Sequence, residues 1–193
     1  MSKQPDLLNV DWSQIPAPAD DGAAAHLKGA AMPQVALQGT DAKQTDLSKL
    51  KGRVVVFAYP RTGVPGQPSL VDDWDMIPGA RGCTPQTCSF RDLFKDLRDA
   101  GADHVFGLST QDHAYQREMA ERLHLPFAVL SDEKLVLTRA LDLPTMQVAG
   151  QTLIKRLALI VDDARIVHVL YPVFPPDSNG PDVLAWLQAN RRR

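Results

Sequence analysis

The feature that most constrains the fold is an apolar run at residues 53–59, Arg-Val-Val-Val-Phe-Ala-Tyr, between Gly52 and Pro60. A run without polar alternation is typical of a central strand that is covered on both faces. The chain has 193 residues, of which 44% are hydrophobic, so it can bury one substantial core. We therefore expect a single main domain built around this strand.

A helix is predicted after a long proline- and glycine-rich passage at 61–82. Thr84 and Pro85 suit the N-cap and the first turn of a helix, and Gly101 suits its end. Between these signals, apolar residues recur at the spacing of one helix face: Phe90, Leu93, Phe94 and Leu97. The pattern predicts one helix between Thr84 and Gly101.

Strand and helix patterns alternate along the rest of the chain, which predicts a sheet with parallel strands. The order of the elements matches the thioredoxin-like fold, an α/β architecture with a central mixed sheet flanked by helices. Residues 1–28 are polar and interrupted by prolines, so we expect an N-terminal extension before a domain at 29–190. We predict strands at 104–108 and 127–130, helices at 114–123 and 134–141, an antiparallel hairpin of 157–161 with 166–171, and a last helix at 183–187 with Trp186 as a core anchor.

Charge and hydropathy argue against two classes of partner. The formal net charge is −2, which gives no broad basic surface, so we expect no nucleic-acid partner. No apolar run approaches the roughly eighteen residues that span a bilayer, and a basic and apolar leader is absent from the first residues. We therefore expect no membrane association and a cytoplasmic location.

Both cysteines of the chain, Cys83 and Cys88, lie in the stretch GCTPQTCSF at 82–90. In a reducing compartment, a close pair of cysteines is more often catalytic, redox-sensing or metal-binding than structural. Cys83 stands at the predicted helix start, where unpaired backbone N–H groups and the helix dipole favour the reactive thiolate. Cys88 lies more than one turn inside the helix, so we expect it to be the more buried and the less acidic.

The spacing of the two cysteines predicts a cycle with two conformations. Five residues of helix advance about 7.5 Å along the axis, whereas a disulfide tolerates Cα separations of about 4.4 to 6.8 Å. A bond between Cys83 and Cys88 therefore requires the first turn to unwind, which Pro85 favours because it has no N–H. We expect an oxidant to convert Cys83 to a sulfenic acid, with which Cys88 condenses to give a disulfide and water.

The cysteines have two other interpretations. Two cysteines cannot complete a tetrahedral zinc site alone, and the five histidines show no ligand spacing near the pair. We therefore expect no metal and no cofactor. Cys88 alone is typical of an ordinary buried cysteine, whereas a glycine before Cys83 and a cap after it place Cys83 at an exposed helix start.

The residues around the cysteines resemble one family. Residues 82–92, Gly-Cys-Thr-Pro-Gln-Thr-Cys-Ser-Phe-Arg-Asp, are similar to the motif of the Q subgroup of peroxiredoxins, also called bacterioferritin comigratory proteins. The Cys-x-x-Cys motif of thioredoxin itself is absent, which argues against a general disulfide reductase. The resemblance also includes 46–53, 105–110, 125–127 and 130–132, and it extends over about 29–190 apart from an insertion at 63–81.

This resemblance implies a thiol-dependent peroxidase that reduces hydrogen peroxide and organic hydroperoxides. It implies that Cys83 is the peroxidatic cysteine, that Cys88 is the resolving cysteine, and that thioredoxin or a similar dithiol is the reductant. It also implies that Arg156 lies beside the thiolate, where a guanidinium stabilises the negative charge and holds a peroxide oxygen. Without the resemblance, Arg156 is typical of a solvated charge on a strand.

The sequence departs from the family pattern Pro-x-x-x-Thr-x-x-Cys before the peroxidatic cysteine. Ala80 stands where the threonine belongs, and the strand-end proline survives as Pro60, well upstream of Cys83. The family threonine donates a hydrogen bond to the peroxide, so another residue must replace it. Thr62 and Thr84 are both candidates.

The insertion at 63–81 contains the large apolar residues Leu70, Trp74, Met76 and Ile77, which a purely solvated loop does not need. We expect them to fold over the Cys83 pocket as a lid that shapes substrate access. The alternative is that they only pack down a long connection.

These observations favour a thiol peroxidase, and a non-enzymatic thiol switch is the alternative. In the switch, the same disulfide alters binding to a partner, and the misplaced threonine is the feature in its favour. Either protein is expected to be a monomer or a homodimer.

Overall fold

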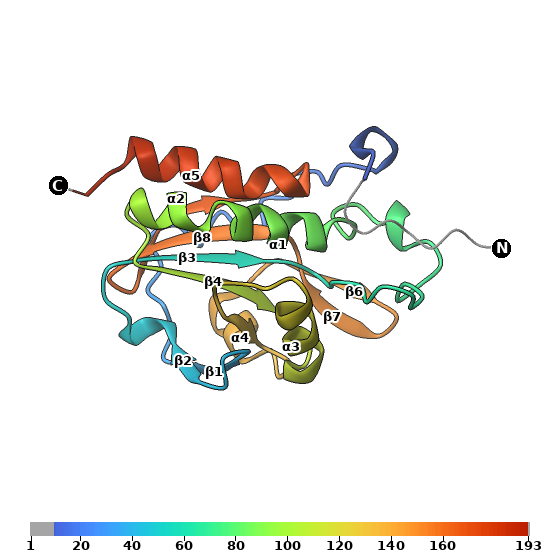
Figure 1. The fold of residues 1–193 in the computed structure, drawn as a ribbon, viewed down its shortest axis with the longest axis horizontal. Coiled ribbons are helices and arrows are strands. Elements are labelled where there is room, and N and C mark those ends of the chain that lie inside the picture. The colour runs from blue at the N-terminus through green and yellow to red at the C-terminus, as the bar shows by residue number, and fades with distance from the viewer. Residues whose placement is uncertain (1–9, 193) are drawn as a thin grey trace.

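The computed structural model describes residues 10–192, and the first nine residues of the predicted extension lie outside that range. Its centre is a mixed sheet in the order β2-β1-β5-β4-β3-β8-β9, and a separate hairpin pairs β6 with β7 (Figure 1). The strands are β1 (Ala36–Gly39), β2 (Gln44–Asp46), β3 (Arg53–Ala58), β4 (His104–Ser109), β5 (Val129–Ser131), β6 (Thr145–Val148), β7 (Gln151–Ile154), β8 (Leu157–Asp162) and β9 (Arg165–Leu170). The helices are α1 (Cys83–Asp92), α2 (Phe94–Asp99), α3 (His113–Arg122), α4 (Val136–Leu141) and α5 (Asn179–Ala189).

The apolar run forms β3, a central strand of the sheet, as predicted. It pairs in parallel with β4 and antiparallel with β8, and every residue in it is buried. Val54 and Val56 pack into one hydrophobic cluster, whereas Val55 and Phe57 pack into another. Because neighbouring residues of a strand point to opposite faces, both faces of β3 are covered.

The cluster around Phe57 joins the sheet to four helices. Phe90 of α1, Leu97 of α2, Met119 of α3 and Val183 of α5 all belong to it. The rings of Phe57 and Phe90 are stacked, with centroids 4.1 Å apart. This contact fixes α1, which begins with Cys83, against the central strand.

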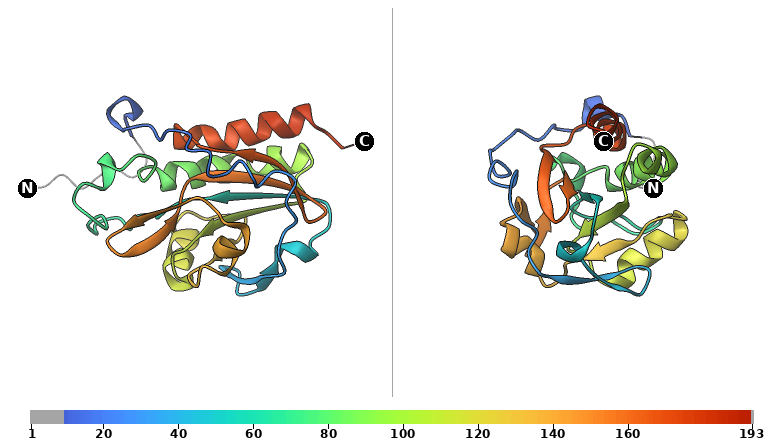
Figure 2. Two further views of the ribbon diagram at one scale, coloured as in Figure 1. Left: turned by 180° about the vertical axis from the view of Figure 1, so that it is seen from behind. Right: turned by 90° about the vertical axis from the view of Figure 1, so that its left-hand side faces the viewer.

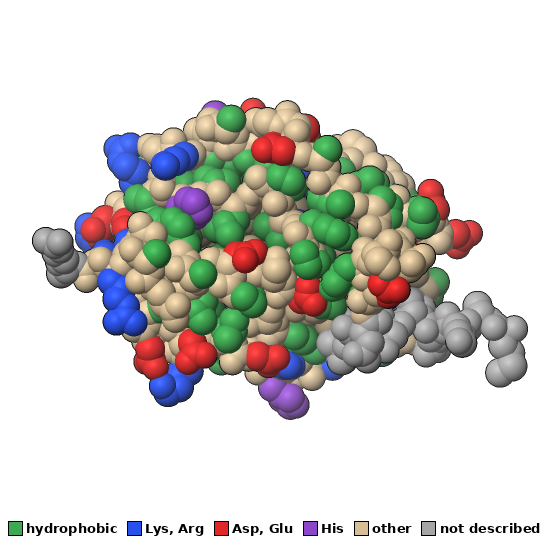
Figure 3. All heavy atoms as spheres, turned by 90° about the horizontal axis from the view of Figure 1, so that it is seen from above, with side chains coloured by type: hydrophobic (Ala, Val, Ile, Leu, Met, Phe, Trp, Pro, Cys, Tyr) green, Lys and Arg blue, Asp and Glu red, His purple; other side chains and the backbone are tan. Residues whose placement is uncertain are grey.

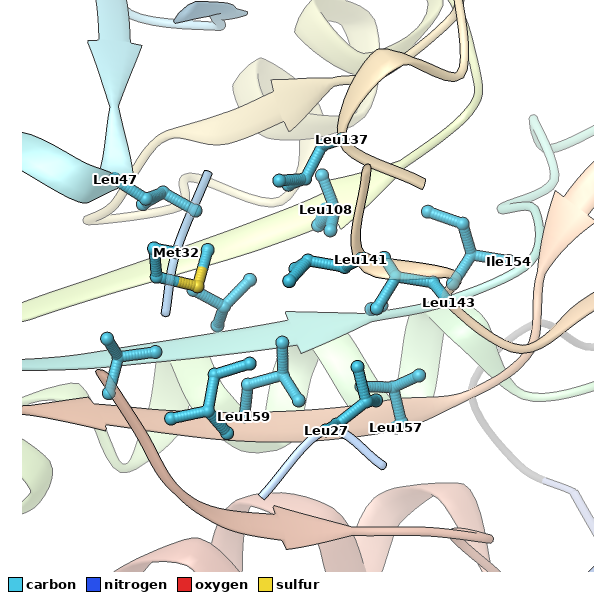
Figure 4. Packing of buried hydrophobic residues seen from close by; sticks show 14 of the residues in the cluster. Leu27, Met32, Leu47, Leu108, Leu137, Leu141, Leu143, Ile154, Leu157 and Leu159 are labelled. Atoms are coloured by element: carbon cyan, nitrogen blue, oxygen red, sulfur yellow. The ribbon is translucent and has the colours of Figure 1, made fainter. Parts of the chain in front are cut away.

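The cluster on the other face of β3 combines α4 with the amino-terminal segment. Leu137 and Leu141 of α4 lie in it with Leu159 of β8, and Leu27 and Met32 come from the amino-terminal side (Figure 4). Figure 2 shows the blue amino-terminal segment running along the sheet and ending in a turn near the start of α5. The boundary predicted at residue 28 stays a prediction, and Leu27, just before it, is fully buried.

The single helix predicted from Thr84 to Gly101 is wrong in two respects. Leu93 is not helical, with φ −96° and ψ 6°, so the segment forms two helices, α1 and α2. Thr84 is not the N-cap, because α1 begins at Cys83 and Gly82 is the N-cap with φ 102°. Glycine adopts this left-handed conformation without the steric cost that a side chain brings. Cys83 is therefore inside the first helical turn rather than before it.

Other predicted elements are present with shifted ends, and several strands were not predicted. Strands β1, β2, β6 and β7 are short and carry mixed polar residues, which weakens their sequence pattern. Trp186, predicted as a core anchor, is partly buried and packs against the edge of the cluster around Phe57. Val183 and Leu187 are the buried apolar residues of α5. The Arg53 guanidinium carbon lies over the Trp186 ring, 5.1 Å from the ring centroid.

The surface over α5 carries side chains of both charges. Figure 3, seen from that side, shows acidic and basic groups interspersed with hydrophobic and neutral ones, so neither sign covers the face. Within residues 10–192, every helix is too short or too polar to cross a membrane.

Substitution of Leu27 tests whether the segment before residue 28 belongs to the core. Leu27→Ala should lower the free energy of unfolding by about 2–5 kcal/mol, because it leaves a cavity in a closely packed cluster. Urea unfolding followed by circular dichroism measures the change. The matched control is Lys28→Ala, which removes an exposed neighbouring side chain and should change stability by less than about 0.5 kcal/mol. Equal stability of the two variants would instead support an extension that ends at residue 28.

Candidate active site

Cys83 is the first residue of α1 and is almost completely buried, with 3% of its surface exposed, so the prediction of an exposed helix start is wrong. Its Sγ donates a hydrogen bond to the carbonyl oxygen of Ala80, 3.5 Å away. Unpaired backbone N–H groups at this end of the helix favour negative charge. The sulfur therefore lies at the positive end of the α1 dipole.

Arg156 lies directly before β8 and brings a guanidinium against this sulfur. Its Nη2 is 3.3 Å from Cys83 Sγ, and only 2% of the residue is exposed. The same nitrogen donates to the carbonyl oxygens of Gly79, Ala80 and Arg81, at 3.2, 3.3 and 3.0 Å. Among residues 10–192, Arg156 forms no ion pair with a carboxylate. Its described contacts are therefore with the Cys83 sulfur and with neutral oxygen acceptors.

Gln86 orients the guanidinium, and the sequence analysis missed it. Its Oε1 accepts a hydrogen bond from Arg156 Nη1. Its Nε2 donates to Asn179 Oδ1 at 2.8 Å and to the Ala58 carbonyl oxygen at 3.3 Å. Gln86 is fully buried. The sequence signal was weak, because a lone glutamine one turn after Cys83 is also a common surface residue of a helix.

Cys88 lies in the same helix as Cys83, and both thiols are free. We predicted Cys88 to be the more buried of the two, which is wrong: its exposed fraction is 8%, against 3% for Cys83. Burial raises the pKa of the Cys88 thiol, and the nearby Arg91 opposes part of this shift. Two hydrogen bonds hold the first turn of α1 between the two cysteines. Gln86 N donates to the Gly82 carbonyl oxygen, and Thr87 Oγ1 donates to the Cys83 carbonyl oxygen.

A small pocket opens onto Cys83. Its free volume is about 40 Å³, which is enough for a molecule of one or a few heavy atoms. Thr62 and Thr84 both line it, so both candidate replacements for the family threonine are near the cysteine. Thr62 Oγ1 donates to Gln111 Oε1 at 3.1 Å. Thr84 Oγ1 has no such partner in the described part of the chain.

The insertion contributes to the wall of this pocket. Leu70 and Trp74 line it, and Trp74 packs with Val148 and Leu153 of the β6–β7 hairpin. Met76 is 64% exposed and takes no part in that packing. The placement of Leu70 and Trp74 fits both interpretations of the insertion, so a lid function stays a prediction.

No group of three or more potential metal ligands is present within residues 10–192. The chemistry that the arrangement supports is that of an activated thiol. It combines a cysteine at a helix start, a buried arginine at its sulfur, a second cysteine and a pocket of small volume.

Alkylation of Cys88 in the variant Cys83→Ser tests its environment. Because burial raises the pKa of Cys88 above its ordinary value of 9.0, little thiolate is present near neutral pH. We expect iodoacetamide to react slowly at about pH 7 to 8 and the rate to keep rising beyond about pH 9. The same variant in urea is the control, since its thiol is solvated. Superimposable profiles for the folded and unfolded variant would contradict this assignment.

Comparison with known proteins places the chain in a family. The Redoxin family model matches residues 27–185. Peroxiredoxin Q from chloroplasts of Oryza sativa subsp. japonica is 34% identical over 164 residues, which cover 84% of this chain and 67% of that protein. Peroxiredoxin Bcp of Escherichia coli (strain K12) is 30% identical over 161 residues, which cover 81% of this chain and 92% of that one.

The solved structures support the same assignment. The crystal structure of peroxidoxin BcpB from Mycobacterium tuberculosis superimposes with a TM-score of 0.69 at 26% identity, covering 86% of this chain and 100% of the other. The similarity confirms the predicted thioredoxin-like fold, with its mixed sheet and flanking helices. The chain therefore belongs to the redoxin family as a peroxiredoxin of the Q/Bcp subgroup, and it is an enzyme of the thiol peroxidase class.

Proposed function

We propose that this protein reduces hydrogen peroxide and small organic hydroperoxides through a sulfenic acid on Cys83 and a disulfide between Cys83 and Cys88. The observation that carries the proposal is the 3.3 Å contact between Arg156 Nη2 and Cys83 Sγ beside a small pocket. A cation held at a sulfur in a site with little water stabilises charge more strongly than it does in bulk water.

The first step is an attack of the Cys83 thiolate on one peroxide oxygen. The S–O bond forms as the O–O bond breaks, and the sulfur loses two electrons. The departing oxygen takes a proton and leaves as water or an alcohol, and Cys83 is left as a sulfenic acid. Arg156 stabilises the negative charge that moves from the sulfur to the departing oxygen.

Thr84 is the better candidate for the role of the family threonine. Both Thr84 and Thr62 line the pocket, but the Thr62 hydroxyl and its backbone N–H already donate to Gln111 Oε1. The Thr84 hydroxyl is free to donate to a peroxide. This assignment gives the site a hydrogen-bond donor despite Ala80.

Cys88 resolves the sulfenic acid. Its sulfur attacks Cys83 Sγ, the S–S bond forms as the S–O bond breaks, and the released hydroxide leaves as water. Five residues of helix keep the two Cα atoms too far apart for this bond. The first turn of α1 must therefore unwind once Cys83 is oxidised.

The disulfide is then reduced by a dithiol of the thioredoxin type, which supplies two electrons and two protons. The chain has only two cysteines, so this reductant must come from another protein or a small thiol. Because both cysteines lie on one helix, a monomer and a homodimer can complete the cycle equally well. A reducing compartment such as the cytoplasm suits a cycle that ends with reduction.

A non-enzymatic thiol switch is the second candidate, favoured by Ala80 at the position of the family threonine. A steady-state assay with thioredoxin, its reductase and NADPH separates the two. A peroxidase consumes many equivalents of peroxide, whereas a switch stops after one stoichiometric oxidation.

Intact mass spectrometry after one equivalent of hydrogen peroxide tests the two cysteine roles. The wild type should lose two hydrogens, because Cys83 and Cys88 form a disulfide. Cys88→Ser should gain one oxygen, which dimedone traps as the sulfenic acid adduct. Cys83→Ser is the control and should keep its mass. Oxidation of Cys83→Ser at the rate of the wild type would assign the peroxidatic role to Cys88.

Matched threonine variants test which hydroxyl serves the peroxide. Thr84→Val keeps the side-chain shape and removes the donor, so kcat/KM for hydrogen peroxide should fall about 10-fold, a loss of about 1.4 kcal/mol. Thr62→Val should change kcat/KM less, because its hydroxyl is bound to Gln111. Thermal unfolding of both variants controls for stability. A larger loss in Thr62→Val would assign the role to Thr62 instead.

A further inference from the structure

The amino-terminal segment reaches the start of α1 through Trp12. This residue begins a short 3-10 turn, Trp12–Gln14, and its Nε1 donates to Asp177 Oδ2 at 3.0 Å. Its ring also meets Phe174 edge to face, with centroids 6.2 Å apart. Asp177 lies in a second 3-10 turn, Pro176–Ser178, directly before α5. Trp12 is thus held against the start of α5 by one hydrogen bond and one ring contact.

The same Trp12 ring touches the residue that precedes Cys83. A Cβ atom added to Gly82 would lie 2.7 Å from Trp12 Cη2 and 2.5 Å from Pro176 Cγ. Both distances are shorter than Cβ contacts in real proteins. The backbone at the N-cap of α1 is therefore packed against Trp12 and Pro176 on one side, with no space left for movement toward them.

A second tie of the segment lies beside Arg156. Asp21 accepts hydrogen bonds from Lys155 Nζ at 2.6 Å and from the Tyr171 hydroxyl at 2.7 Å. Between the two ties, Pro18 lines a cavity together with Arg156. We call residues 12–21 the strap. Trp12 at one end of the strap lies against Gly82, the residue before Cys83. Asp21 at the other end binds Lys155, the residue before Arg156.

The contacts at Gly82 oppose the movement that the disulfide needs. To bond with Cys88, Cys83 must leave the first turn, and this displaces Gly82 from Trp12 and Pro176. Contacts that exist in the closed state and not in the opened state raise the free energy of local opening and slow it. The strap therefore favours the conformation in which Cys83 faces Arg156.

We propose that Trp12 is a positioning residue that holds the first turn of α1 and so sets how fast Cys83 reaches Cys88. This inference rests on the proposed two-cysteine cycle. Release of Trp12 speeds disulfide formation and shortens the lifetime of the sulfenic acid. A second hydrogen peroxide then has less time to convert the sulfenic acid to a sulfinic acid, a step that adds one oxygen and releases water.

Hydrogen exchange of the reduced protein tests the hold of Trp12 without any peroxide. In Trp12→Ala, the amides of residues 83–92 should exchange at least about 5-fold faster than in the wild type. Asp177→Ala removes only an exposed acceptor and should have a smaller effect in the same direction. Ser13→Ala is the matched control, because Ser13 lies on the same turn but bonds only to its neighbours Asp11 and Gln14. Unchanged exchange at residues 83–92, or equally faster exchange throughout the chain, would overturn the proposal.

Rapid quenching with acid and thiol alkylation after one equivalent of hydrogen peroxide then follows the cysteines by mass. Loss of the Cys83 thiol should keep its rate in Trp12→Ala, while the disulfide should form several-fold faster and less sulfinic acid should accumulate under excess peroxide. Trp12→Phe keeps a ring without the donor, so its rate of disulfide formation should lie between those of Trp12→Ala and the wild type. Trp12→Phe also serves as the test if Trp12→Ala does not fold.

Equal rates of disulfide formation in all variants would overturn the role of Trp12 and leave the two-cysteine cycle intact. If Cys83 is not oxidised, the cycle fails, and the exchange measurement still decides whether Trp12 holds α1.

Discussion

The contact between the buried guanidinium of Arg156 and the sulfur of Cys83 is the interaction on which the rest of the structure depends. A buried cation needs partners, and within residues 10–192 no carboxylate pairs with this one. Three carbonyl oxygens at residues 79–81 and the Gln86 side chain accept from its two Nη groups, whereas its Nε has no hydrogen-bond partner among the described residues. Carbonyl dipoles compensate a charge only in part, and the Cys83 sulfur is the remaining atom that this guanidinium contacts, 3.3 Å from Nη2. The helix start, the insertion and β8 are all needed to hold it.

The contacts that hold Cys83 in the first turn of α1 oppose the second step of the cycle that we propose, which is formation of the disulfide with Cys88. In the proposed cycle, the contacts of Gly82 with Trp12 and Pro176 and the bond from Gln86 N to the Gly82 carbonyl must break before the Cys83 sulfur reaches Cys88. An enzyme of this kind needs a closed state stable enough to bind peroxide and an open state accessible enough to form the disulfide. The balance lies at the first turn of α1, which the bond from Gln86 N to the Gly82 carbonyl closes and which Trp12 and Pro176 contact from outside.

Features that depend on local pattern could be predicted from the sequence. Roles that depend on contacts between segments far apart in the chain could not. The apolar run at 53–59 and the alternation of strands and helices were enough for the fold class, because burial on two faces leaves a plain signature. The cysteine pair and Arg156 were found by motif. Gln86 and Trp12 were missed, since a polar helix residue and a tryptophan in a polar segment acquire roles only through contacts far along the chain. The break at Leu93 and the greater burial of Cys83 were also missed, because the apolar spacing continues through Leu93 and the burial of a residue depends on the tertiary fold.

The predicted insertion at 63–81 and the amino-terminal strap both contact residues around the site. The insertion ends in the three carbonyls that bind Arg156, and its Leu70 and Trp74 line the Cys83 pocket. The amino-terminal strap contacts Gly82 and Lys155, each one residue away from the reacting pair. Extra residues in a solvated loop are tolerated without contacts to buried groups. Both segments here instead contact residues beside Cys83 and Arg156. Residues 79–81 at the end of the predicted insertion provide the carbonyl acceptors for Arg156, and Ala80, which stands where the family pattern has threonine, is one of them.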